Sequence, residues 1–308
     1  KTAITTVAAT LFLILVGGLV RAAGAGLGCP DWPTCFGMWI PPTNLADLPA
    51  GFDASQFNVY KTWIEYINRL VGVLIGLLII ATFALSFRYR KEKSAVFYSS
   101  FIALVLVIFQ GWLGGLVVRS ELNEWLITIH MLVAMVLVNM LLYAAFKAST
   151  DLFKVLIDES LRKKLLWIAS ILLAFTLIQL VLGTQVREAI DVIKDSEFVP
   201  PRSFWLDSLG NIFPIHRSFS WVVFLMGAYF YYVLQKGKAE GIILNLGQLI
   251  IFLILFQVGI GIGLYHLDMP RVLQVLHLVG AALLICGQFL FILVLGLAAN
   301  PGGKSAGE

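Results

Sequence analysis

Charged residues are scarce in this sequence. Asp, Glu, Lys and Arg make up 13% of its 308 residues, against roughly 25% in an average soluble domain. It contains no glycine-rich phosphate-binding loop and no nucleic-acid-binding signature, which argues against a nucleotide-driven or nucleic-acid-binding protein. The formal net charge of +4 says little about partners when so few charges are present. The composition is not that of a soluble domain.

Apolar residues are correspondingly abundant, at 59% of the chain with a mean hydropathy of +0.90. A run of about 18 or more apolar residues can cross the roughly 30 Å core of a bilayer as a helix. Eight such spans are predicted, over about 3–22, 62–87, 95–118, 125–147, 165–186, 213–234, 242–264 and 272–298. We therefore expect an all-α membrane protein with eight transmembrane helices. The first helix should be retained, because no A-x-A-like cleavage site follows it.

The distribution of Lys and Arg predicts the orientation of these spans. Most basic residues fall in the segments that are cytoplasmic if the N-terminus is inside, as the positive-inside rule favours. An even number of spans then places both termini in the cytoplasm of a bacterial cell. Two long loops, 23–61 and 187–212, are predicted on the outer side.

Segments of the chain resemble one another at a nearly constant offset. Residues 109–130 (FQGWLGGLVVRSELNEWLITIH) align with 256–277 (FQVGIGIGLYHLDMPRVLQVLH), and NRLVGVLIGL from Asn68 aligns with HRSFSWVVFL from His216. Apolar helices often look alike, but a third match, of VGGLVR with LGTQVR, keeps the same order and favours a duplication. Its offset is larger because the first loop is 18 residues longer than its counterpart. We expect four-helix halves at 1–150 and 151–300, related by a pseudo-twofold axis along the membrane normal. A disordered tail is predicted over 301–308.

Only four histidines occur, and three of them occupy equivalent positions of the repeat. His130 aligns with His277, and His216 aligns with Asn68, each about six or seven residues inside the outer end of its predicted helix. Ionisable groups inside a membrane are costly and indicate function, and facing histidines in a helix bundle are typical axial ligands of haem. Zinc would need three or four ligands together, and a histidine hydrogen-bonded to a neighbouring helix is the structural alternative. His266 lies just outside the seventh span and is predicted to be a loop or propionate-adjacent residue.

Several arginines lie near the outer ends of the spans. Haem propionates are carboxylates, which the Arg guanidinium binds as a bidentate fork, so these residues are predicted to orient haem with its propionates outward. Extension of the side chain to the membrane interface is the alternative for each of them. The candidates are Arg21, Arg69, Arg119, Arg187, Arg217 and Arg271.

The two halves differ at the predicted ligands. The second half retains two histidines, which would give a six-coordinate, electron-transferring iron. In the first half Asn68 replaces one histidine, and Glu65 lies three residues earlier on the same helix face, where the second half has Phe213. The first half should therefore hold a haem with an open or water-bound position beside a carboxylate that moves protons or stabilises positive charge. An ion pair of Glu65 with Arg69 is an alternative that is compatible with this role.

The whole chain resembles the haem A synthase family. The motifs that carry the resemblance are GGLVRAAGAGLGCPDWPTC at 17–35, EYINRL at 65–70, HRS at 216–218 and the histidines of the fourth and eighth spans. The resemblance implies oxidation of the C8 methyl group of haem O to a formyl group through a hydroxymethyl intermediate. It also implies that His216 and His277 ligate a haem b, that His130 holds the substrate haem, and that Glu65 is the essential carboxylate. Asn68 departs from the usual Glu-x-x-His-Arg, so either His130 holds the iron alone, which we favour, or the activity is altered.

Cys29 and Cys35 lie in the first predicted outer loop, separated by five residues. A disulfide between them is favoured in the oxidising space outside a bacterial membrane, and the resemblance agrees. A metal site is the less favoured alternative. Cys286, in the eighth span, is predicted to be buried packing.

The resemblance also implies partners. Haem O would be handed over by haem O synthase, haem A would be used by a terminal oxidase, and membrane lipid would surround the chain. The residues leave open the electron donor and whether the chain forms a homo-oligomer. A non-enzymatic di-haem cytochrome and a haem carrier remain the alternative functions.

Overall fold

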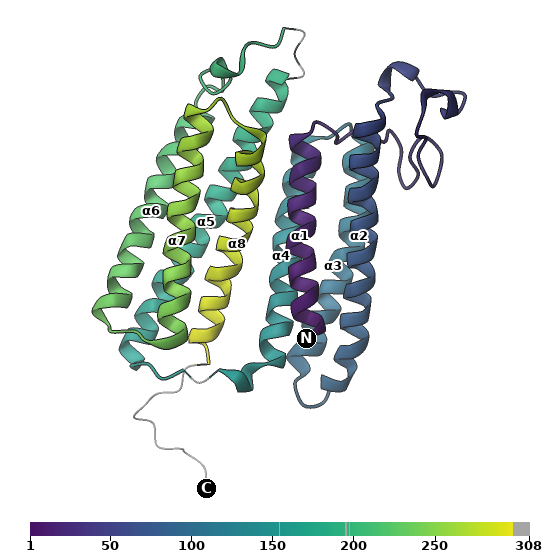
Figure 1. The fold of residues 1–308 in the computed structure, drawn as a ribbon. Helices are drawn as coiled ribbons and strands as arrows, with labels where there is room; N and C mark the ends of the chain where they lie inside the picture. The colour runs from purple at the N-terminus through teal and green to yellow at the C-terminus, as the bar shows by residue number, and fades with distance from the viewer. Residues whose placement is uncertain (154, 195, 197, 298–308) are drawn as a thin grey trace. The chain divides into compact units, whose positions relative to one another are not determined.

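The computed structural model describes residues 1–153, 155–194, 196 and 198–297. Within these residues eight helices are long and apolar enough to cross a membrane, and no strand is formed (Figure 1). This confirms the predicted all-α membrane class. The helices are α1 (Thr2–Ala22), α2 (Val59–Ser86), α3 (Ser94–Arg119), α4 (Glu124–Ala148), α5 (Glu159–Lys194), α6 (Ile212–Lys236), α7 (Gly241–His266) and α8 (Arg271–Leu295). The predicted tail at 301–308 lies outside the described residues.

Helix α5 is longer than the sequence predicts at both ends. Its apolar part was predicted over 165–186, but the helix continues for one polar turn or more on each side, because ion pairs between neighbouring turns stabilise the polar segments. Glu159 pairs with Arg162 at 2.7 Å, and Asp191 pairs with Arg187 at 3.4 Å. The predicted loop over 187–212 is accordingly shorter, and Arg187 lies inside the helix rather than at its end.

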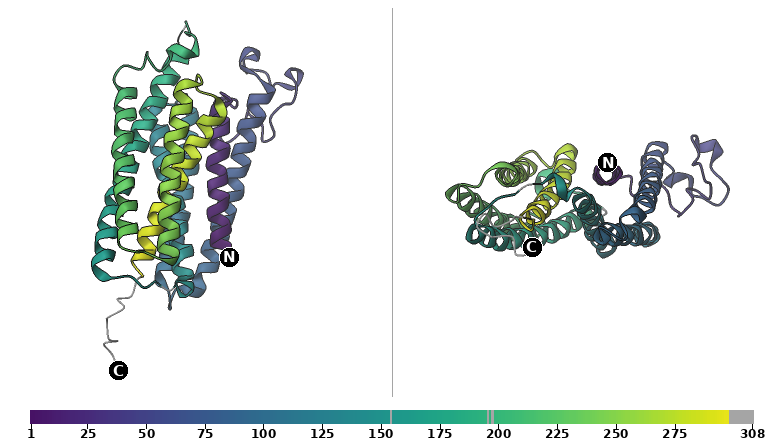
Figure 2. Two further views of the ribbon diagram at one scale, coloured as in Figure 1. Left: turned by 60° about the vertical axis from the view of Figure 1, so that its left-hand side comes forward. Right: turned by 90° about the horizontal axis from the view of Figure 1, so that it is seen from below.

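The chain divides into two compact units. The first comprises Lys1–Ala145 with Gln274–Val279, and the second comprises Phe146–Leu273 with the remainder of α8 from Gly280. Figure 2 shows the helices of each unit running side by side. The pseudo-twofold relation between the halves stays a prediction.

Each unit has an apolar core with a few buried polar contacts between helices. In the first unit, Ile79 of α2 and Leu141 of α4 are fully buried, and the hydroxyl groups of Thr6 and Thr82 are 2.8 Å apart between α1 and α2. In the second unit, Gln288 Nε2 of α8 donates to Thr176 Oγ1 of α5 at 2.9 Å. Such contacts satisfy polar groups where no water is present.

The outer surfaces of the helices are also apolar. Helix α2, for example, exposes Val73, Leu74 and Leu77, and α7 exposes Phe252 and Leu255. A continuous exposed apolar surface is unfavourable in water but is what lipid solvates. The chain is thus a multi-pass membrane protein.

Candidate functional site

In the first unit His130 is held against α3 by two residues one turn apart. Gln110 Nε2 donates a hydrogen bond to the backbone oxygen of His130 at 2.9 Å. Gly114 lies four residues later on the same face of α3, and a methyl group added there would be 3.6 Å from His130 Cε1. The glutamine fixes the helix backbone that bears His130, and the glycine leaves room for the imidazole ring.

The second unit repeats this arrangement around His216. Gln179 Nε2 of α5 donates to the backbone oxygen of His216 at 3.0 Å. Gly183, again four residues later, faces the ring so closely that an added methyl group would be 3.2 Å from His216 Cε1. Two histidines in different units therefore share one local geometry. The supporting helix is α3 for His130 and α5 for His216.

Asn68 occupies the corresponding place on α2, opposite Gly17 of α1. A methyl group at Gly17 would lie 4.0 Å from Asn68 Oδ1, which keeps the same glycine-facing arrangement with more space. Asn68 Oδ1 and His130 Nδ1 are both buried, and neither has a hydrogen-bond partner among the described residues. Buried polar atoms without a partner are rare and mark sites that are completed by something other than the chain itself.

The four predicted ligand positions are not equally far from their helix starts. Asn68 lies nine residues beyond the start of α2 at Val59, whereas His216 lies four beyond the start of α6 at Ile212. The prediction of six or seven residues holds for His130 and His277, whose helices begin at Glu124 and Arg271. It is wrong for the other two. Helix α2 is extended by the Asn58 cap, whose Oδ1 accepts from the Lys61 N–H at 3.1 Å, and α6 begins only at Ile212.

His277 lies in the Gln274–Val279 segment that belongs to the first compact unit, whereas His216 belongs to the second. Their pairing across one haem therefore stays a prediction. Gln257, the repeat equivalent of Gln110, lies beside Gly280 of α8, and its Nε2 is buried without a partner among the described residues. No group of three His, Cys, Asp or Glu side chains in the described part of the chain is arranged to hold a metal ion.

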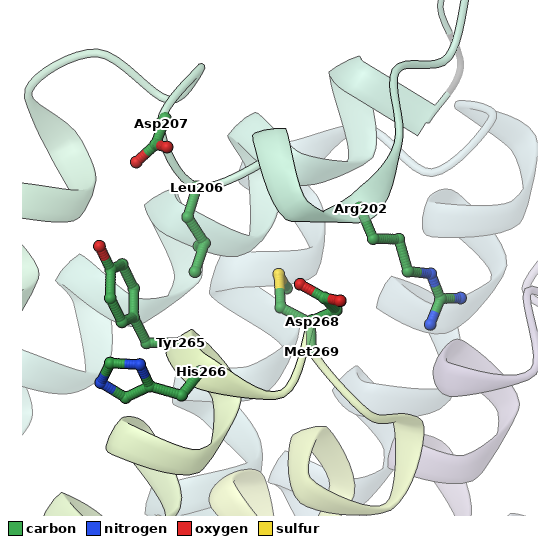
Figure 3. Close-up of a pocket in the computed structure, with 7 residues that line it drawn as sticks. All are labelled: Arg202, Leu206, Asp207, Tyr265, His266, Asp268 and Met269. Atoms are coloured by element: carbon green, nitrogen blue, oxygen red, sulfur yellow. The ribbon is translucent and has the colours of Figure 1, made fainter.

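His266 is the last residue of α7 and is exposed. It lines an open cavity of about 210 Å³ together with Tyr265 and Asp207, with Arg202 at the opposite side of the opening (Figure 3). The sequence predicted a loop or propionate-adjacent residue just outside the seventh span, but His266 still belongs to α7; its place beside a propionate stays a prediction.

The predicted propionate-binding arginines fall into two groups. Arg119, Arg217 and Arg271 are exposed, and the Arg217 guanidinium lies 5.6 Å from the centre of the Phe213 ring one turn earlier. Arg21, Arg69 and Arg187 are partly buried. Of these, Arg187 already contacts Asp191. No ion pair among the described residues involves the three exposed arginines, so each can turn toward a carboxylate without breaking one.

Glu65 lies at the centre of a buried polar network. It is 4% exposed, its Oε2 accepts the Cys29 N–H at 2.9 Å, and its Oε1 pairs with Arg69 Nη2 at 2.5 Å. The ion pair weighed as an alternative for Glu65 is therefore present. One helix face thus carries, in order, a fixed carboxylate at Glu65 and the unpartnered amide oxygen of Asn68.

The predicted disulfide between Cys29 and Cys35 is formed. Both cysteines are at most 1% exposed and pack with Phe36 in a small core of the outer loop. Cys286 is free and buried, as predicted. The Cys29–Cys35 loop also places Trp32 against α3, where a methyl group on Gly115 would lie 2.9 Å from the indole.

Sequence reasoning missed the groups that support the ligands. Gln110 and Gln257 open the two repeated segments, so their equivalence was visible, but no role could be assigned to them without the packing of α3 on α4. Asp31 was also missed. Its carboxylate accepts the N–H groups of Phe36 and Gly37 and the hydroxyl of Thr34, which shapes the disulfide loop.

Comparison with known proteins adds a family to this geometry. The family described as cytochrome oxidase assembly protein (COX15-CtaA) matches residues 1–288. The chain belongs to this family. Its relatives include a protein named heme A synthase from Shewanella oneidensis, 26% identical over 312 residues that cover 91% of each chain. Another of that name, from Bartonella tribocorum, is 22% identical over 310 residues, covering 90% of this chain and 86% of the relative. A third, from Alkalihalophilus pseudofirmus, is 35% identical over 121 residues, or 39% of this chain.

The described residues fit haem by their own chemistry. Imidazole is a common axial ligand of haem iron, and Gly114 and Gly183 each leave the space that a side chain would take beside an imidazole. His130 Nδ1 and Asn68 Oδ1 are buried in the same unit, without hydrogen-bond partners among the residues that the structure describes. These features suit a site that receives a group with its own polar and metal-binding atoms.

Proposed function

We propose that this protein is a haem A synthase that oxidises the C8 methyl group of haem O to a formyl group through a hydroxymethyl intermediate. The observation that carries the proposal is the family match over residues 1–288, since relatives named heme A synthase align with about nine-tenths of the chain. The buried Glu65 and Asn68 on one face of α2 support it, because a protein that only conducts electrons has no need of a carboxylate beside an incomplete ligand set.

In the second half, His216 and His277 are proposed to hold the iron of a resident haem b. When bound, this haem would supply one-electron transfer. Gln179 and Gly183 would orient the imidazole of His216. Arg187, Arg217 and Arg271 would hold the propionates.

In the first half, His130 is proposed to hold the iron of the substrate haem O. Asn68 has no basic ring nitrogen and is a poor iron ligand, so it leaves the opposite side open. Ligation from one side suits a substrate that must enter and leave. Arg21 and Arg119 would hold its propionates, and Glu65 would accept or donate protons, or stabilise positive charge, near the methyl group that reacts.

The proposed setting is the bacterial cytoplasmic membrane, with both termini in the cytoplasm and both haem sites near the outer face. Haem O would come from a haem O synthase and haem A would pass to a terminal oxidase.

The pigment bound to purified protein tests this function. Extraction is expected to yield haem B together with haem O or its hydroxymethyl or formyl derivative. Haem B alone, filling both halves, would instead indicate a di-haem electron-transfer protein.

Glu65→Gln provides the second test. Loss of a general acid–base group lowers rates by about a hundredfold or more, so haem O is expected to accumulate in place of haem A. The amide retains an acceptor for the Cys29 N–H, so the loop should stay folded. Unchanged haem A formation would remove Glu65 from the mechanism.

A further inference from the structure

Arg69 directly follows a predicted ligand position, and its sequence context suggested that it binds a propionate. Its contacts are different. Nη1 donates to the backbone oxygens of Asp31 and Thr34, each at 2.8 Å. Nη2 donates to the backbone oxygen of Cys29 at 3.4 Å and to Glu65 Oε1 at 2.5 Å.

A guanidinium has five N–H donors, four of them on the two terminal nitrogens. Those four are engaged by three carbonyls of the disulfide loop and by Glu65, which leaves only the Nε–H of Arg69. A bidentate grip on a propionate would require Arg69 to give up part of this set. Its repeat equivalent, Arg217, is exposed, and the contact described for it is with the Phe213 ring, so the two arginines are used differently.

The disulfide loop is docked on α2 at a second point as well. Thr62 is fully buried, and its Oγ1 donates to the backbone oxygen of Gly28 at 2.8 Å. Gly28 approaches the helix so closely that an added methyl group would lie 2.3 Å from the Lys61 oxygen. The loop therefore contacts α2 over two turns, from Lys61 to Arg69.

The loop in turn holds Glu65. One carboxylate oxygen accepts the Cys29 N–H of the loop. The other pairs with Arg69 of the same helix, whose guanidinium also donates to the loop carbonyls. A side chain with both oxygens engaged is restricted to one rotamer, and a reacting group must be held in this way to be effective.

We propose that Arg69 is a positioning residue that docks the Cys29–Cys35 loop on α2 and, together with the Cys29 N–H, fixes the orientation of the Glu65 carboxylate. This rests on the proposed role of Glu65 in haem O oxidation. The docking itself is independent of that role, because its contacts involve only the chain.

Disulfide reduction in the detergent-purified full-length protein tests the docking. Cys29 and Cys35 are at most 1% exposed, so a reductant reaches them only after the loop opens. The rate of reduction is measured by alkylating the released thiols and determining the mass of the protein. Arg69→Gln is expected to raise this rate about tenfold or more, because it removes charge-assisted hydrogen bonds that oppose opening of the loop. Lys61→Gln removes an exposed cation from the same helix and should leave the reduction rate unchanged. If Arg69→Gln does not fold, Thr62→Val replaces it as the test. It removes the other contact between the loop and α2, and it should also raise the rate of reduction.

Substrate binding and turnover separate positioning from propionate binding. For Arg69→Lys, haem O binding measured by spectral titration is expected to stay within about twofold of wild type, while conversion falls about tenfold, since the ammonium cannot reproduce the fork. Unchanged disulfide reduction in Arg69→Gln together with weakened haem O binding would overturn the proposal and make Arg69 a propionate ligand. If no haem O is converted by the wild type, the proposed function fails while the reduction experiment still decides the docking.

Discussion

Replacing Gly183 by alanine tests whether the imidazole of His216 is held in a fixed orientation. The added methyl group would lie 3.2 Å from Cε1 and 3.7 Å from Nδ1 of the ring. The first distance is a few tenths of an ångström shorter than ordinary carbon contact. The ring cannot easily withdraw, because Gln179 holds the His216 backbone oxygen at 3.0 Å. Overpacking of a well-packed site costs about 1–3 kcal/mol, and one methyl group at this distance should fall near the lower limit.

A cost of about 1 kcal/mol corresponds to about fivefold in an equilibrium. If His216 ligates the proposed haem b, Gly183→Ala is expected to release that haem to apomyoglobin about fivefold faster than wild type and to shift the low-spin electron paramagnetic resonance signal. Gly259→Ala is the matched control on α7, since nothing lies within 4 Å of the methyl group that it adds. Wild-type release from Gly183→Ala, or equal acceleration in Gly259→Ala, would contradict the assigned role of this glycine.

Two further substitutions test the packing of each unit. Gly28→Ala places a methyl group 2.3 Å from the Lys61 backbone oxygen, so the loop must move. We expect a lower thermal midpoint of unfolding and faster reduction of the disulfide. Gly72→Ala is the control, because the space around its added methyl group is open, and it should show neither change. Thr176→Val leaves the fully buried Gln288 Nε2 without its 2.9 Å acceptor, which costs about 1–3 kcal/mol, and an unaltered thermal midpoint would show that this contact does not stabilise the second unit.

Much of the fold could be predicted from the sequence because its signals are local. Eight apolar runs predicted eight helices, since a bilayer core sets the length that each must reach. Helix ends were less predictable, as α5 shows. Its polar ends at Glu159 and Lys194 remain helical through ion pairs between turns, and an apolar-run criterion does not register such pairs.

The site was predictable in part for the same reason. The repeat alone matches His130 with His277 and His216 with Asn68, whose roles as ligands stay predictions. The Cys29–Cys35 disulfide, favoured by spacing and compartment, is formed. What each supporting residue contacts could not be predicted. In the sequence, Gln110 is one of several polar residues in the spans. Its hydrogen bond to the His130 backbone is evident only from the packing of α3 against α4.

The sequence by itself determined the number of spans and the paired cysteines, because these depend on composition and spacing along the chain. Only the tertiary structure decided how Arg69 is used. Its charge and place beside a predicted ligand position suit a propionate equally well, but the path of the outer loop brings three backbone oxygens to its terminal nitrogens, beside Glu65 of the same helix. A guanidinium has a fixed number of donors, so the groups that the fold brings within reach determine its role.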